Sequence, residues 1–151
     1  MANRPRRIAV GISALTLALV GVSAPSASAA TVRCTYDGTS GGWNAKCSRY
    51  TNDGDAGGVS GTAAIQNNSL YADIEFEADG ELVSMQNYSG RSIKYVLKYW
   101  DYGTWETEVN THFTNDVKAF NLSIPEGRDV TIEMYGHSSG NRYVALSTLK
   151  S

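Results

Sequence analysis

Apolar and polar residues alternate with a period of two along almost every segment of the chain after residue 30. From Leu70 to Glu77, apolar side chains take one set of alternate positions, and a tyrosine and three acids take the other. The same alternation runs through residues 93–100, 119–124 and 130–135. A period of two is typical of β-strands that bury one face and expose the other. The pattern therefore predicts an all-β domain.

Six further segments have the composition and length of strands: Val32–Tyr36, Asn44–Tyr50, Val59–Gln66, Leu82–Asn87, Trp105–Phe113 and Tyr143–Leu149. Turn-forming Gly, Asn and Asp residues separate the segments, and none has the periodicity of an amphipathic helix. Closely spaced turns between short strands are typical of antiparallel sandwiches and barrels. We predict a single antiparallel β-sandwich of about eight to ten short strands, with a flexible Gly-rich loop over residues 52–61.

The first 30 residues have the composition of a secretory signal peptide. Three arginines precede an apolar run of fifteen residues, and Ala27-Ser28-Ala29 matches the small-residue cleavage pattern. Cleavage after Ala29 or Ala30 leaves a domain of residues 31–151. Because the apolar run is shorter than the roughly 20 residues that cross a bilayer, we expect a secreted, extracellular protein with no membrane association after cleavage.

The charge balance narrows the classes of partner. The chain has 13 basic and 15 acidic residues. Three of the basic residues belong to the signal segment, so ten remain in the domain, and its net charge is about −5 with histidine neutral. Nucleic acids and anionic membranes attract clustered lysine and arginine. The acidic balance therefore argues against a nucleic-acid partner.

Two cysteines, Cys34 and Cys47, lie close to the predicted start of the domain. An exported protein with an even number of cysteines is expected to oxidise them to disulfides. We predict one bridge that staples an N-terminal hairpin. A redox or zinc site is disfavoured because the two cysteines have neither C-x-x-C spacing nor a nearby histidine. We expect no metal and no cofactor.

Two short motifs resemble functional loops. Gly136–Gly140 matches the G-x-S-x-G pattern of a nucleophile elbow, which presents its serine at a strand-to-helix turn. Here the motif lies between two strand segments, so a hairpin loop is the favoured interpretation. Asp53 and Asp55 begin a sequence similar to a calcium loop, but Gly57 and Ala64 stand where further oxygen ligands belong. A solvated loop is favoured, and weak calcium binding stays open.

Titratable side chains suggest two hydrolytic hypotheses. His112 and His137 have the chemistry of a general acid and base for an extracellular ribonuclease, but the sequence does not place them together. Two strands carry alternating acids: Asp73, Glu75 and Glu77 on one, Glu106 and Glu108 on the other. Acids two residues apart on a strand lie roughly 6 to 7 Å from each other, which suits a glycosidase. Alternating acids also serve solubility and edge protection, which is the favoured interpretation.

The most unusual composition falls at residues 98–106, where four aromatic rings lie within seven residues. If Tyr99 faces the core, Trp100 points outward, and one or two rings are exposed. Exposed rings stack on the apolar faces of sugars or anchor a peptide. We therefore predict a ligand surface with Trp100, Tyr102 and Trp105 as stacking platforms and Asp101 as a polar orienter. The alternative is that the two tryptophans pair across the strands and pack inside the domain.

These observations predict a secreted, non-catalytic binding module for carbohydrate or cell-envelope glycan. A secreted protein-binding inhibitor or toxin-like effector is the first alternative, because Trp and Tyr also dominate protein interfaces. A small secreted hydrolase is the second alternative, and it requires two of the weak catalytic patterns to meet in space.

The chain resembles the small secreted β proteins of high-GC Gram-positive bacteria, the actinobacterial type. The signal segment, the paired cysteines and the Gly/Ser/Thr-rich composition carry the resemblance, with three phrases in the domain: residues 89–93, 100–105 and 124–127. The resemblance implies export and a β fold. It implies no activity and no site residue.

Overall fold

The computed structural model describes residues 34–35, 43–51 and 56–151, and within these residues it contains ten β-strands and no helix. The strands are β1 (Cys34–Thr35), β2 (Asn44–Thr51), β3 (Val59–Asn67), β4 (Leu70–Glu77), β5 (Leu82–Asn87), β6 (Ile93–Asp101), β7 (Thr104–Phe113), β8 (Asp116–Asn121), β9 (Asp129–Gly136) and β10 (Arg142–Lys150). The predicted all-β class is confirmed.

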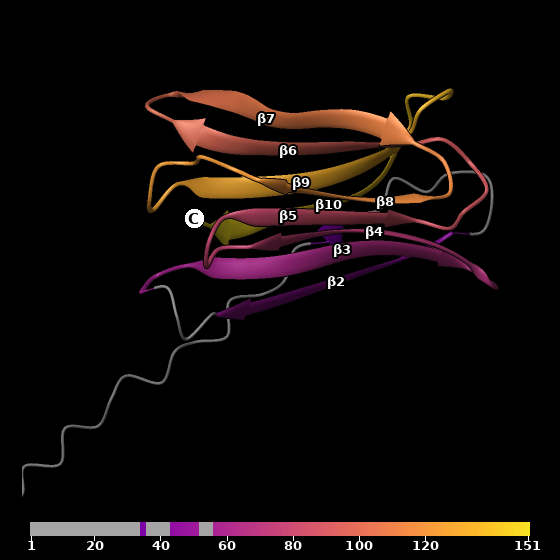
Figure 1. Ribbon diagram of the computed structural model, residues 1–151, viewed down its shortest axis with the longest axis horizontal. Coiled ribbons are helices and arrows are strands. Elements are labelled where there is room, and N and C mark those ends of the chain that lie inside the picture. Colours follow the sequence, from indigo (N-terminus) through magenta and orange to yellow (C-terminus); the bar gives the residue numbers. More distant parts are fainter. Residues whose placement is uncertain (1–33, 36–42, 52–55) are drawn as a thin grey trace, which may run out of the picture.

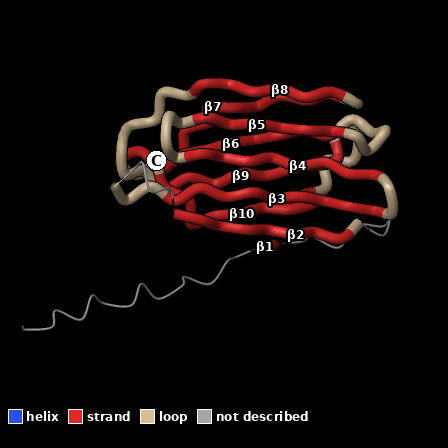
Figure 2. The backbone as a smooth tube through the Cα atoms, turned by 60° about the horizontal axis from the view of Figure 1, so that its bottom comes forward, coloured by secondary structure: helices blue, strands red, loops and turns tan. Residues whose placement is uncertain are grey.

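All ten strands belong to one antiparallel sheet. Its order is β7-β6-β9-β10-β3-β4-β5-β8, with β1 paired to β10 and β2 paired to β3. One half of the sheet consists of β7, β6, β9, β10 and β1, and the other of β2, β3, β4, β5 and β8. The two halves lie over one another (Figures 1 and 2), so that the sheet forms a nearly closed, barrel-like shape. The predicted sandwich of separate sheets is not confirmed, because Lys150 of β10 pairs with Val59 of β3 and joins the halves.

The disulfide between Cys34 and Cys47 is confirmed, with a Cα–Cα distance of 5.7 Å. Its place in the fold differs from the predicted hairpin. The strand that carries Cys34 pairs with β10, whereas the strand that carries Cys47 pairs with β3. The bridge therefore links the two halves of the sheet at the junction between β10 and β3.

The core lies between the two halves, and the alternation seen in the sequence identifies most of it. The fully buried large side chains include Tyr95, Phe76, Ile65, Ile74, Met85, Ile93, Leu97, Ile132, Met134, Leu146, Leu149 and Val83. Tyr95 stacks on Phe113 with ring centroids 4.7 Å apart. Its hydroxyl crosses the core and donates a hydrogen bond to the backbone oxygen of Gln86 at 2.8 Å, so that one polar contact joins β6 to β5.

The eighth strand begins and ends earlier than predicted. The alternation suggested a strand over residues 119–124, but β8 covers Asp116–Asn121. Its pairing with the whole of β5, from Asn87 to Leu82, fixes these limits. As a result Phe120 is 40% exposed, whereas Ile124 is buried beyond the end of the strand.

Three predictions concern residues outside or at the border of the described part. The signal segment of residues 1–30, Asp53 and Asp55 lie outside the described residues. Of the predicted loop over residues 52–61, the last three residues belong to β3.

The part of the chain that the structure describes holds no helix with the length and hydropathy that a membrane crossing needs.

Candidate functional site

The four residues of the predicted ligand surface meet at the turn between β6 and β7. Tyr102 and Gly103 form a two-residue turn, and both have positive φ, 43° and 108°. Positive φ at both central positions is the condition for the type I′ turn, whose twist matches that of a β-hairpin. The turn sets Trp100 directly opposite Trp105 and leaves Tyr102 at the tip.

A β-bulge decides which way Trp105 points. Leu97 pairs with Val109, but its neighbour Lys98 pairs with Thr107, so that Glu108 is an extra residue in β7. One extra residue exchanges the inward and outward positions of a strand from that point on. Because of the bulge, Trp105 lies on the outer face beside Trp100.

The two indoles pair across the strands but are not buried. Their ring centroids are 5.4 Å apart and the planes meet at 65°, an edge-to-face arrangement. Trp100 is 39% exposed, Trp105 is 46% exposed and Tyr102 is 89% exposed. The prediction of exposed rings is confirmed, and the alternative in which the pair packs inside the domain is wrong.

Arg128, just before β9, holds this cluster together, and sequence reasoning missed it. Its guanidinium lies 4.4 Å from the ring centroid of Tyr102 and forms an ion pair with Asp101 at 3.1 Å. No sequence pattern pointed to this residue, because the contact depends on the pairing of β6 with β9. We call Trp100, Asp101, Tyr102, Trp105 and Arg128 the aromatic patch.

Three other tyrosines, Tyr88, Tyr135 and Tyr143, do not belong to the aromatic patch. Tyr143 is buried and packs against Trp43, with ring centroids 6.3 Å apart. Tyr88 is exposed, but it follows β5 on the other half of the sheet. Tyr135 pairs with Lys94, which lies six residues before Trp100 on β6.

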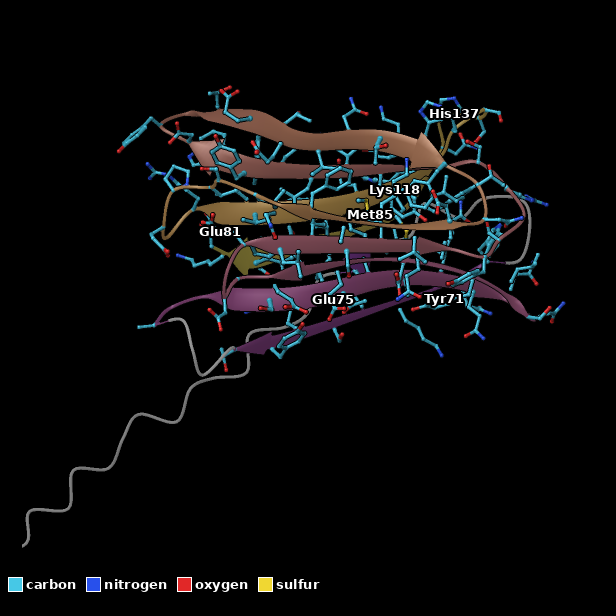
Figure 3. All side chains as sticks on the ribbon, in the orientation of Figure 1. Tyr71, Glu75, Glu81, Met85, Lys118 and His137 are labelled. Carbon is cyan, nitrogen blue, oxygen red and sulfur yellow. A yellow bond between two sulfur atoms is a disulfide. The ribbon has the colours of Figure 1, made fainter. Side chains whose placement is uncertain are left out.

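The acids of β4 are held by phenol groups. Tyr71 donates a hydrogen bond to Asp73, and Tyr50 donates one to Glu75 at 2.7 Å. Burial raises the pKa of Asp73, although the hydrogen bonds from Tyr71 and the Gln86 backbone act in the opposite direction. Figure 3 shows Tyr71 and Glu75 on the lower strands, far from the β6–β7 turn. Three cavities, lined in part by Glu81, Lys94 and Arg91 respectively, do not have these acids in their linings.

The two histidines are stacked on one another, which the sequence did not predict. Their ring centroids are 3.8 Å apart and the planes differ by only 6°. They line a cavity of about 470 Å³ together with Lys94, Asn110, Tyr135, Gly136 and Gly140. We call this cavity the imidazole pocket. His112 comes from the end of β7 and His137 from the loop after β9.

The G-x-S-x-G segment forms the predicted hairpin loop. Gly136 ends β9, and its carbonyl accepts a hydrogen bond from the Gly140 N–H at 2.8 Å. Strand β10 follows, so Ser138 is not presented at a strand-to-helix turn. No carboxylate lines the imidazole pocket among the described residues. The imidazole pocket therefore brings together the two histidines of the ribonuclease hypothesis, without a carboxylate among its described lining residues.

A further cavity of about 510 Å³ has an acidic lining that includes Asp79, Glu81 and Glu126. Within the described ranges, no group of three or more His, Cys, Asp or Glu side chains is placed to hold a metal ion. Comparison with protein-family models, with curated proteins and with solved structures finds no match to this chain.

Proposed function

We propose that this chain is a secreted, non-catalytic binding module for carbohydrate or cell-envelope glycan. Export is supported by the signal-like composition of residues 1–30 and by the disulfide, which suits an oxidising compartment. The observation that carries the proposal is the exposure of three aromatic rings on one hairpin.

The aromatic patch has the chemistry that sugar recognition needs. An exposed ring offers a flat apolar surface on which the C–H groups of a sugar can stack, and neighbouring polar groups orient the hydroxyls. Asp101 supplies acceptors and Arg128 supplies donors beside Tyr102. The cation–π contact and the type I′ turn fix the ring of Tyr102, so less conformational entropy is lost on binding.

A protein partner is the second candidate, and Arg128 favours it. Tyrosine, tryptophan and arginine are the residues most enriched at the energetic centres of protein interfaces. The aromatic patch contains all three types, on one hairpin and in the residue just before β9. A secreted inhibitor or toxin-like effector would use the same residues against a protein surface.

Retention on insoluble polysaccharides separates the two candidates. Purified domain is incubated with cellulose, chitin and bacterial cell-wall glycan, and bound and free protein are measured. We expect retention of the wild type on at least one glycan, and weakening of about fivefold in Trp100→Ala and in Trp105→Ala, as about 1 kcal/mol per stacked ring implies. Tyr88→Ala is the matched control, since it removes an exposed ring outside the aromatic patch. Absence of retention on every glycan would refute the proposal.

A further inference from the structure

The imidazole pocket and the aromatic patch lie at opposite ends of one outer face. Along β6 the outward positions run from Trp100 through Lys98 to Lys94, and Lys94 pairs with His112 on the neighbouring strand. Six residues of strand span about 20 Å. Figure 3 shows His137 near the end of β7, at the opposite end from the β6–β7 turn that carries the aromatic patch. A single extended chain lying along this face would reach both.

The imidazole pocket is basic within a domain that is acidic overall. Lys94 contributes the positive charge, and the lining contains no carboxylate among the described residues. A second hollow of about 330 Å³ shares Gly136 and His137 with it and adds Arg91 to its lining, again without a described carboxylate. Two cationic side chains therefore flank the stacked histidines.

A carboxylate on this face, between the imidazole pocket and the aromatic patch, is paired with two cations. Glu133 is buried and contacts Lys98 at 3.1 Å and Arg142 at 3.6 Å, and it accepts a hydrogen bond from the Tyr135 hydroxyl at 2.9 Å. Burial and this hydrogen bond raise the pKa of Tyr135, so its phenol stays neutral at ordinary pH. Neither group opposes a negative charge in the imidazole pocket.

Several hydrogen-bond donors converge on the imidazole pocket. The Lys94 ammonium lies 5.8 Å from the ring centroid of Tyr135 and forms no ion pair within the described part of the chain. The stacked imidazoles of His112 and His137 and the Asn110 amide, which line the same pocket, are side chains that can donate hydrogen bonds. An ammonium group repels cations, so this set selects an anion.

The loop that carries His137 is fixed before any ligand binds. The His137 backbone N–H donates to the Ser92 oxygen at 3.1 Å, and the Gly136 N–H donates to the Asn141 oxygen at 2.9 Å. A Cβ on Gly136 would lie 2.5 Å from the Tyr143 hydroxyl, so glycine is what allows the loop to pack this closely. Preorganised donors lose little entropy when they bind an anion.

We propose that the imidazole pocket binds the anionic group, phosphate or carboxylate, of an acidic saccharide chain whose sugar rings stack on the aromatic patch. This inference rests on the proposed function and names the ligand class for it. Lys94 provides the charge, and His112, His137 and Asn110 provide hydrogen bonds to the oxygens of the anion.

The first test uses inorganic phosphate, which needs no glycan. Isotope-labelled domain is titrated with phosphate and with galacturonate while the imidazole signals are followed by NMR. We expect saturable shifts at His112 and His137, and binding at least fivefold weaker in Lys94→Gln. Lys150→Gln removes the same charge from an exposed pair with Asp129 and should leave binding unchanged. No saturable shift with either anion, or equal weakening in both variants, overturns the inference.

The second test separates failure of this inference from failure of the proposed function. Retention is compared on immobilised polygalacturonate and on an immobilised neutral glucan. We expect Lys94→Gln to weaken retention on the acidic polymer alone and Trp100→Ala to weaken it on both. If the domain is retained on glycan but binds neither phosphate nor galacturonate, the assignment of an anion site to the imidazole pocket is wrong, and the proposed function stands. Anion binding without retention on either polymer overturns the saccharide assignment, and absence of retention on cellulose, chitin and cell-wall glycan as well overturns the proposed function.

Discussion

Gly61 lies where β3 packs closely against side chains of β10, and its substitution tests the closure of the fold. It lies on β3 opposite Arg49 of β2 and Phe76 of β4. A Cβ at this position would lie 2.6 Å from the Ser48 backbone oxygen, 2.7 Å from Leu149 Cδ2 and 3.0 Å from Leu146 Cδ2. The absence of a side chain is therefore what allows β10 to approach β3.

The expected loss in the free energy of unfolding follows from these contacts. Carbon atoms pack about 3.5 to 4.0 Å apart, so the added methyl group would be about 1 Å too close to a fully buried leucine and to a backbone oxygen held in the sheet. Overpacking of this kind costs about 1 to 3 kcal/mol. Alanine also lowers the conformational entropy of the unfolded chain, which stabilises the folded state by up to about 1 kcal/mol. We expect Gly61→Ala to lower the free energy of unfolding by about 2 kcal/mol, or about 8 °C in melting temperature.

Urea unfolding followed by tryptophan fluorescence measures this loss, and an unchanged m-value shows that the same surface is exposed. Asn121→Ala is the control, because this exposed residue lies outside the junction of β10 with β3. We expect a loss below about 0.5 kcal/mol there. If Gly61→Ala were as stable as the wild type, β10 would not pack against β3 as described, and the barrel-like closure would be wrong.

Three further predictions concern stability. Replacing Cys34 and Cys47 by serine should lower the free energy of unfolding by about 3 kcal/mol, as expected for a loop of this length, and an unchanged urea midpoint would contradict the bridge. Asn87→Ala should lower the free energy of unfolding by about 2 to 4 kcal/mol, because the buried amide donates to the Phe113 oxygen at 2.7 Å and to the Arg91 oxygen at 2.9 Å. The exposed control Asn121→Ala should lower it by less than about 0.5 kcal/mol in the same assay. Because burial raises the folded-state pKa of Asp73 above 3.8, its contribution to stability is greatest below that pH and declines as pH rises through the folded value. Unfolding measured at several pH values from about 3 to 7 should show this decline in the wild type and not in Asp73→Asn, and equal slopes would refute it.

The sequence predicted the individual strands well because burial imposes alternation locally. The segment Leu70–Glu77 has the predicted limits, and the inward positions of β6 and β9 are those that the alternation assigned. The exposure of Trp100 was also predictable, because the alternation along residues 93–100 places it on the face opposite to Tyr99. These features depend on residues close together in the chain.

The remaining features depend on contacts between distant residues. Alternation identifies a buried face but not the strand that pairs beside it, so the junction of β10 with β3 could not be predicted. The stacking of His112 on His137 follows from the pairing of β6 with both β7 and β9, which no local pattern encodes. The bulge at Glu108 has no signature in composition, although it determines the direction of Trp105.

Acrylamide quenching of tryptophan fluorescence tests the role of the aromatic patch most directly. The chain has three tryptophans, of which Trp43 is buried while Trp100 and Trp105 are exposed. The measurement is made with and without soluble oligosaccharides released from the glycan that retains the domain. We expect the oligosaccharide to protect the two exposed indoles, so that quenching falls in the wild type and stays unchanged in a Trp100→Phe/Trp105→Phe double variant. If the oligosaccharide binds while quenching of the wild type is unchanged, the ligand lies elsewhere and the aromatic patch is not its site.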